Sequence, residues 1–212
     1  MHCAKSNILA SSSSWGRQLI DISLCSIGLA VLSPVFVLIA CGILWETGFP
    51  ILFSQNRVGR GGQKFRLLKF RTMQTGKSGL FVTVSGDPRV TSFGRFLRRF
   101  KLDEIPQLWN VVRAEMALVG PRPEVPEFVD LSHPAWQSVL RVRPGVTDPV
   151  SITFRNEEKL LAMASNPILY YRETILPAKL AMSLVYLQQR SWWFDLNVIL
   201  RTLNCVINPD KV

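Results

Sequence analysis

Apolar positions divide the chain into one long uninterrupted block and several shorter patterned segments. Between Ile22 and Trp45 no side chain is ionisable apart from cysteine. A helix of about 20 apolar residues is enough to cross the roughly 30 Å of membrane hydrocarbon, so the block predicts a membrane helix. Ser33 and Pro34 stand near its middle, where proline removes a backbone donor and clashes with the preceding turn.

Basic residues on both sides of the block indicate how it lies in the membrane. Lys5 and Arg17 precede it, and further cations follow at Arg57, Arg60, Lys64 and Arg66. Cytoplasmic flanks of membrane helices are rich in Lys and Arg, so both ends are drawn to the same side. This predicts a re-entrant helix over residues 17–48 that is kinked at Ser33 and Pro34, with Ser33 able to satisfy carbonyls freed at the kink.

Two other interpretations of the apolar block stay open at this point. One is an ordinary transmembrane anchor that tolerates its proline. The other is a cleaved export signal ending near Cys41, which is disfavoured because the apolar stretch is long and begins late.

The shorter segments predict strands first and helices later. Residues 50–55 and 64–70 are typical of two short strands joined by a glycine-rich turn at residues 59–62. Residues 91–101 place apolar and basic side chains at helical spacing, which predicts an amphipathic helix with a cationic face. Apolar positions at helical spacing also mark residues 170–189 and 196–207, with Trp192, Trp193 and Phe194 between these two helices.

These elements predict a mixed, helix-rich α/β protein. We expect a mobile lead-in over residues 1–16, then the re-entrant helix, then a catalytic domain over residues 49–212. The amphipathic helices of this compact domain would lie at the membrane interface.

Charge and composition narrow the class of partner. The 212 residues carry 25 Lys and Arg against 15 Asp and Glu, a formal net charge of +10. Such an excess predicts an anionic partner, namely nucleic acid, lipid headgroups or a phosphorylated substrate. The apolar block favours a membrane protein over a nucleic-acid binder. Four cysteines without paired spacing and two histidines leave carboxylates, cations and a loosely held metal for any chemistry.

Two adjacent acids, Asp103 and Glu104, are the first candidates for that chemistry. They open the segment Leu-Asp-Glu-Ile-Pro-Gln-Leu-Trp-Asn at residues 102–110. Asp103 suits the start of a helix with Pro106 in its first turn. A capping Asp103 and a first-turn Glu104 that favours the helix dipole would therefore explain the pair without catalysis.

Several cations are candidates for binding phosphate. Arg122 stands between two prolines that limit its backbone freedom, and its planar guanidinium suits phosphate oxygens. The full set of candidates is Lys69, Arg71, Arg98, Arg122, Arg141 and Arg143. Each has an ordinary alternative interpretation as part of a solvated basic edge or a rigid surface turn.

The order of these motifs resembles that of the bacterial sugar transferase family, the monotopic phosphoglycosyl transferases that begin glycan assembly on polyprenyl phosphate. The resemblance runs from about Arg17 to Ile207, is most specific at Asp103 and Glu104, and fits the small, minimal form of the family. It rests on the apolar block with its Ser-Pro and on the segments at residues 53–59, 69–73, 86–89, 102–110, 120–123 and 144–147.

The resemblance implies a two-step covalent mechanism. Asp103 matches the family nucleophile, which attacks the phosphorus next to the sugar of a UDP-sugar and releases UMP before polyprenyl (undecaprenyl) phosphate takes the phosphosugar. Glu104 matches the second acid, assisting the acceptor phosphate or the metal. Lys69, Arg98 and Arg122 would contact phosphates, and Mg²⁺ would bind at Asp103.

The resemblance also implies a place in the cell. The active domain is expected on the cytoplasmic face of the bacterial inner membrane, in contact with anionic lipid and not with nucleic acid, at the first membrane step of polysaccharide or glycoconjugate synthesis. It leaves the sugar, the pathway and the oligomeric state open.

Two departures from the family pattern and two rival functions remain. Glu115 lies where the family often has Asp in Arg-Gly-Asp-Met-Ser, and keeps the charge. Residues 148–151 read Asp-Pro-Val-Ser where many relatives have Gly-Trp-Ala-Gln, which bears on sugar specificity.

The rival functions are a basic membrane-anchored binding module without catalysis and a glycosyl transferase that releases UDP.

Overall fold

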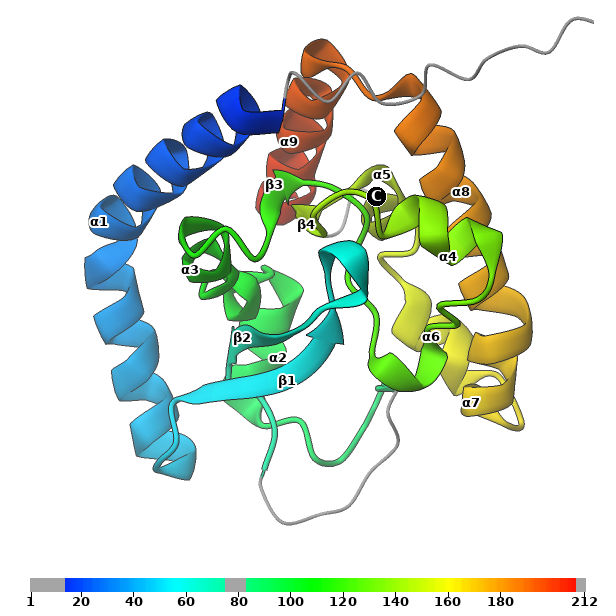
Figure 1. Cartoon of the computed structure of the whole chain (residues 1–212). Helices are drawn as coiled ribbons and strands as arrows, with labels where there is room; N and C mark the ends of the chain where they lie inside the picture. The colour runs from blue at the N-terminus through cyan, green and yellow to red at the C-terminus, as the bar shows by residue number, and fades with distance from the viewer. Residues whose placement is uncertain (1–13, 75–82, 209–212) are drawn as a thin grey trace, which may run out of the picture.

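One long helix, α1 (Ser14–Thr47), forms a whole flank of the molecule. The structure is a computed structural model that describes residues 14–74 and 83–208, so almost all of the predicted lead-in lies outside the described residues. Within those two ranges, α1 is the helix long and apolar enough to cross a membrane. Figure 1 shows that α1 arches around the rest of the chain and changes direction along its length.

The helix continues through Pro34 because a side chain replaces the missing hydrogen bond. Pro34 cannot donate to the carbonyl four residues earlier, which belongs to Ala30. The hydroxyl of Ser33 donates to this oxygen over 2.8 Å. The sequence therefore predicted correctly that Ser33 would satisfy a freed carbonyl.

Both ends of α1 are fixed to the same body by polar contacts. Near its start, Arg17 Nη1 lies 3.4 Å from Asp195 Oδ2. At its end, Glu46 Oε1 accepts from the Phe93 amide over 3.2 Å, and the guanidinium of Arg71 donates to Thr47 Oγ1 over 2.6 Å. Both ends of α1 therefore contact the same body, and Cys25 and Ile39 from within the helix pack against it too.

An antiparallel hairpin follows α1, as predicted. It consists of β1 (Leu52–Val58) and β2 (Lys64–Phe70), joined through a 3₁₀ turn, η2 (Arg60–Gly62). Gly61 and Gly62 have φ values of 67° and 79°, which glycine adopts without the cost that a side chain would add. The turn glycines thus serve the hairpin.

A second, two-stranded sheet brings together distant parts of the chain. β3 (Ala117–Val119) pairs in parallel with β4 (Gly145–Thr147). A Cβ on Gly145 would lie 2.1 Å from the backbone nitrogen of Gly120. Because only two glycines allow this approach, the Gly-Pro-Arg-Pro and Pro-Gly-Val-Thr segments lie side by side.

Short helices surround these strands. The predicted amphipathic helix is α2 (Ser92–Arg99), and the predicted C-terminal helices are α8 (Leu176–Gln189) and α9 (Trp192–Ile207). Trp192 to Phe194 were expected between helices but belong to α9, because Ser191 Oγ accepts from the Phe194 amide and caps the helix there. The others are η3 (Leu102–Glu104), α3 (Gln107–Val112), η4 (Pro126–Phe128), α4 (Pro134–Val139), α5 (Pro149–Thr153), α6 (Glu157–Ala162), α7 (Pro167–Tyr170) and the π-helical turn η5 (Tyr171–Ile175).

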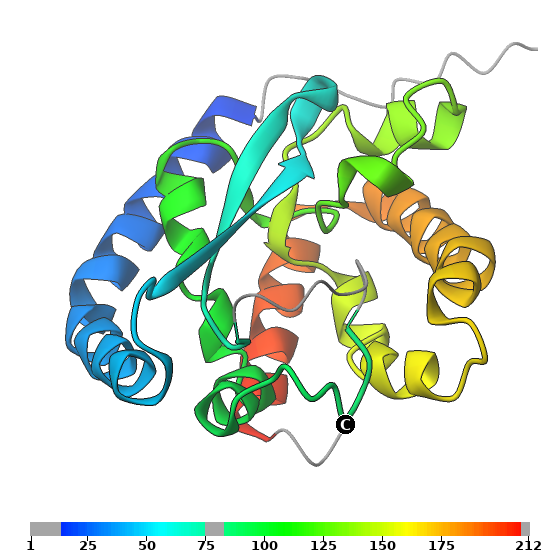
Figure 2. The same ribbon diagram turned by 90° about the horizontal axis from the view of Figure 1, so that it is seen from below.

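Two of the buried groups of apolar side chains lie on opposite sides of the molecule. One joins α1 to the hairpin and α2 through Ile39, Ile43, Phe70 and Leu97. The other joins α4, η5 and α8 through Trp136, Val139, Tyr171 and Ile175, among others. Seen from below in Figure 2, β4 and α9 lie between these two sides.

Candidate functional site

Asp103 and Glu104 lie on η3, a single 3₁₀ turn between α2 and α3. Lys101 precedes the turn with a φ of 54°, in the left-handed region that non-glycine residues seldom adopt. The predicted helix start at Asp103 is wrong: α3 begins only at Gln107, with Pro106 in the capping position. Asp103 is 6% exposed and is free of a capping role.

Glu104 is held by two cations from different elements. Its Oε1 accepts from Lys69 Nζ of β2 over 2.8 Å, and its two oxygens accept from the two terminal nitrogens of Arg122 over 2.5 and 3.2 Å. Burial alone would raise the pKa of Glu104, but Arg122, Lys69 and Lys101 outweigh it and hold this pKa well below its usual range. Glu104 is therefore an ionised partner of the two cations.

Asp103 has the opposite surroundings. Its Oδ1 is buried and has no hydrogen-bond partner. Burial raises the pKa of Asp103, and Glu104 raises it further, against the lowering effect of Lys69, Lys101 and Arg98. Two adjacent carboxylates with pKa values pushed apart are typical of sites in which the two acids do different work.

The loop that carries Arg122 is placed by β3 and β4. The Gly120 amide donates to the Thr147 carbonyl over 3.1 Å, and the Gly145 amide donates to the Pro121 carbonyl over 3.0 Å. The Arg122 amide donates to Asp148 Oδ2 over 3.2 Å. Asp148 is 1% exposed and also caps α5, so one buried carboxylate joins the Arg122 loop to that helix.

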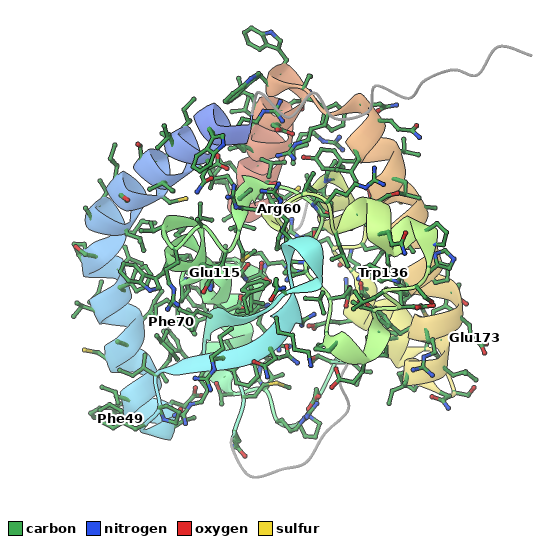
Figure 3. All side chains as sticks on the ribbon, viewed as in Figure 1. Phe49, Arg60, Phe70, Glu115, Trp136 and Glu173 are labelled. Carbon is green, nitrogen blue, oxygen red and sulfur yellow. The ribbon has the colours of Figure 1, made fainter. Side chains whose placement is uncertain are left out.

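A cavity of about 1080 Å³ opens in front of the two acids. Asp103, Glu104, Lys69, Arg98 and Arg122 all line it. Its wall continues to α4, where Trp136, labelled in Figure 3, is another lining residue. Further cationic lining residues are Arg57, Arg95, Arg99, Lys101, Arg155, Lys159 and Lys179. A site with one unpartnered carboxylate and many cations suits a polyanionic substrate.

Arg98 approaches this cavity from α2. Its Nε donates to Thr72 Oγ1 over 3.1 Å, and its Nη1 donates to Glu158 Oε1 over 3.0 Å. Arg98 thus connects Thr72, just after β2, with Glu158 of α6.

The other predicted cations lie elsewhere. None of Arg71, Arg141 and Arg143 is among the residues that line the cavity. Arg71 comes after the end of β2, so it does not share the face of Lys69, and its guanidinium binds the end of α1. Arg143 donates to the Ala114 carbonyl and to Gln18 Oε1 over 2.9 and 2.7 Å, and Arg141 is exposed on the surface.

Glu124 and Tyr171, which the sequence did not single out, also line the cavity. Glu124 is 9% exposed and accepts from the hydroxyl of Tyr171 over 2.6 Å. Its Oε2 lies 3.6 Å from Arg57 Nη1. The position of Glu124 directly after Pro-Arg-Pro was a usable signal, whereas nothing near Tyr171 in sequence pointed to it.

A metal site made by the protein alone is not found in the described part of the chain. No group of three or more His, Cys, Asp or Glu side chains gathers there in a way that could hold an ion. Mg²⁺, however, commonly uses one or two carboxylates together with substrate phosphates and water. The unpartnered Oδ1 of Asp103 fits such a ligand, while both oxygens of Glu104 are already taken by cations.

The chain matches a protein-family model described as "Bacterial sugar transferase" over residues 12–209. It is 33% identical over 200 residues to a UDP-glucose:undecaprenyl-phosphate glucose-1-phosphate transferase of Caulobacter vibrioides, covering 92% of this chain and 71% of that one.

Two further relatives have similar names. An undecaprenyl-phosphate glucose phosphotransferase of Komagataeibacter xylinus is 34% identical, covering 88% of this chain and 35% of that one. The exopolysaccharide production protein ExoY of Rhizobium meliloti is 32% identical, covering 90% and 84%. The chain thus spans between about a third and five sixths of the length of these two relatives.

Proposed function

The chain belongs to the bacterial sugar transferase family and is a phosphoglycosyl transferase, and on that premise we propose that it moves a sugar phosphate from a UDP-sugar to undecaprenyl phosphate through a covalent intermediate on Asp103. The observation that carries the proposal is the buried, unpartnered carboxylate oxygen of Asp103 at the wall of a cation-lined cavity. Such an oxygen is poised to act as a nucleophile rather than as a structural acceptor.

The first step forms an acyl phosphate. A carboxylate oxygen of Asp103 attacks the phosphorus next to the sugar, the bond from that phosphorus to the bridging oxygen breaks, and its electron pair leaves with UMP. In the second step an oxygen of the acceptor phosphate attacks the same phosphorus. The bond to Asp103 breaks, the free carboxylate returns, and the product is a polyprenyl diphosphate sugar.

The cations around the two acids supply electrostatic stabilisation for both steps. Negative charge spreads over the phosphoryl oxygens during such transfers. Lys69 and Arg122 are held within reach by Glu104, and Arg98 is held at the same cavity by α2. Lys69 and Arg122 donate their side-chain hydrogen bonds to Glu104, which leaves Oδ1 of Asp103 without a hydrogen-bond partner in the free enzyme.

Mg²⁺ is the cofactor that this chemistry calls for. Asp103 is the residue that would hold it, together with the donor phosphates. When bound, the ion would neutralise phosphate charge and support the leaving UMP.

The contacts of α1 support a re-entrant insertion on the cytoplasmic face of the inner membrane. A spanning helix needs its ends in different compartments, whereas both ends of α1 bind one body through Arg17 and Glu46. Its outward side chains are apolar, with Leu38 71% and Trp45 95% exposed. The helix would therefore enter the membrane and return, with the cavity on the side of the nucleotide donor.

The test measures which nucleotide leaves. Detergent-purified protein is incubated with Mg²⁺, polyprenyl phosphate and a panel of UDP-sugars, with Asp103→Asn beside it and Asp195→Asn as a control for a buried carboxylate outside the cavity. We expect UMP from wild type and from the control, and a loss of at least about a thousandfold for Asp103→Asn. With donor alone, the wild-type chain should gain the mass of the sugar phosphate.

Each rival function predicts a different result. Release of UDP would indicate a glycosyl transferase, and an active Asp103→Asn would remove Asp103 from the mechanism. No nucleotide from any donor, with intact folding, would favour a binding module.

A further inference from the structure

The loop that carries Arg122 has no regular structure of its own. Residues 120–125 form neither helix nor strand, and Pro121 and Pro123 have no amide hydrogen to donate. Such a segment keeps one conformation only if other elements bind it. The position of the Arg122 guanidinium therefore depends on the groups that anchor the loop.

The anchors before Arg122 and those after it come from different elements. Those before it are the backbone bonds to β4 described above, with Asp148 at Arg122 itself. After Arg122, the Pro123 carbonyl accepts from Arg57 Nη1 over 3.1 Å, and the Glu124 carbonyl accepts from the Val58 amide over 2.9 Å. The side chain of Glu124 then accepts from Tyr171.

The Tyr171 contact is a buried anchor of the loop. Tyr171 is 3% exposed, and its ring packs against Phe128 with centroids 5.0 Å apart. Tyr171 is the first residue of η5, the π-helical turn between α7 and α8. Such π turns are often found at functional sites. The C-terminal helices thus reach the Arg122 loop through this hydrogen bond and through the packing of Val125 against Tyr171 and its neighbours.

We propose that Tyr171, acting through Glu124, is a positioning residue that fixes Arg122 for the donor phosphates. The inference rests on the proposed function, because it takes Arg122 to bind those phosphates. Without the hydroxyl, the Glu124 carboxylate keeps only Arg57, whose Nη1 is 3.6 Å away. The loop can then shift, and displacements of about 1 Å near reacting groups reduce rates substantially.

Tyr186 provides a matched control within the same chain. Its hydroxyl donates to Asp195 Oδ1 over 2.9 Å, and it is 2% exposed. Neither Tyr186 nor Asp195 lines the cavity. Tyr171→Phe and Tyr186→Phe therefore remove the same kind of bond, between a buried phenol and a carboxylate, and should lower the thermal unfolding midpoint similarly.

The kinetic readout separates positioning from stability. For Tyr171→Phe we expect kcat/KM for the donor to fall by roughly tenfold, mainly through KM, with the acceptor KM unchanged. Tyr186→Phe should stay within about twofold of wild type. Equal effects of the two variants on the donor would overturn the proposal.

A double-mutant cycle tests the route through Arg122. If Tyr171 acts by placing Arg122, then Tyr171→Phe should add nothing to the loss caused by Arg122→Lys. Additive losses would overturn the proposal. Glu124→Gln, which keeps an acceptor for the hydroxyl, should retain more activity than Glu124→Ala, and equal losses would count against it.

The cycle also distinguishes the two levels of inference. If Arg122→Lys is fully active, Arg122 does not bind the donor phosphates, and the positioning role proposed for Tyr171 is wrong as well. If Arg122→Lys is impaired but Tyr171→Phe is not, only the role of Tyr171 fails. If wild type releases no UMP at all, the proposed function itself is wrong.

Discussion

Two regions of the molecule contain the same set of charges and differ in what surrounds them. In one, Glu104 binds Lys69 and Arg122. In the other, Asp195 lies between Arg17 and Arg190, with Oδ2 at 3.4 and 3.3 Å from their nitrogens. Each region is thus a largely buried carboxylate with two cations.

The difference lies in the neighbours. The Asp195 group joins α1, α8 and α9, and none of its three members lines the cavity. The Glu104 group lies on the cavity wall, next to an acid with an unpartnered oxygen. A buried charge cluster alone does not identify a site, whereas the unpartnered Asp103 oxygen at the cavity makes the Glu104 cluster the candidate site.

Removing the central acid should break the two clusters to a similar extent. Glu104→Gln and Asp195→Asn each leave two partly buried cations without their counter-charge, so each should lower the free energy of unfolding by about 3 kcal/mol or more. Denaturant unfolding in detergent measures this. A negligible loss in either variant would show that its cluster is solvated rather than structural.

The rate of UMP release should differ between the variants of the two clusters. In Glu104→Gln, Lys69 and Arg122 are free to pair with Asp103 and to weaken it as a nucleophile, so UMP release should fall by about a hundredfold. Asp195→Asn should lose less than about threefold when both are assayed well below their unfolding temperatures. Similar losses in the two variants would mean that the Glu104 effect reflects stability alone.

The smallest expected effect concerns Asp103 and pH. Burial raises the pKa of Asp103, so the folded state binds its proton more tightly than the unfolded state does. Its contribution to stability is therefore lost as pH rises from the ordinary carboxyl range through the raised pKa. Asp103→Asn removes this cost and should be about 1 kcal/mol more stable than wild type at neutral pH, with the difference closing in acid. Unfolding midpoints measured across pH test this, and an Asn variant less stable than wild type at neutral pH would contradict it.

Local pattern was enough to predict most elements. The apolar block corresponds to α1, the two segments beside the glycine-rich turn form the hairpin, and helical spacing located α2, α8 and α9. Each of these signals depends on neighbouring residues alone. Five of the residues singled out from the sequence also line the cavity: Asp103, Glu104, Lys69, Arg98 and Arg122.

Other features could not be predicted locally. The break between η3 and α3 at Pro106 looked like one capped helix in sequence. Arg71 looked equivalent to Lys69 two residues earlier, yet it binds the end of α1. The Arg71 side chain follows a partner from another element, which residue spacing does not specify.

The sequence by itself determined the long apolar helix, the hairpin, the family and the pair of adjacent acids, since these depend on hydrophobic period, turn chemistry and motif order. Only the tertiary structure decided that Asp103 Oδ1 has no hydrogen-bond partner, that Lys69 and Arg122 bind Glu104, and that the hydroxyl of Tyr171 donates to Glu124. The physical reason is that desolvation and ion pairing depend on distances between residues far apart in the chain.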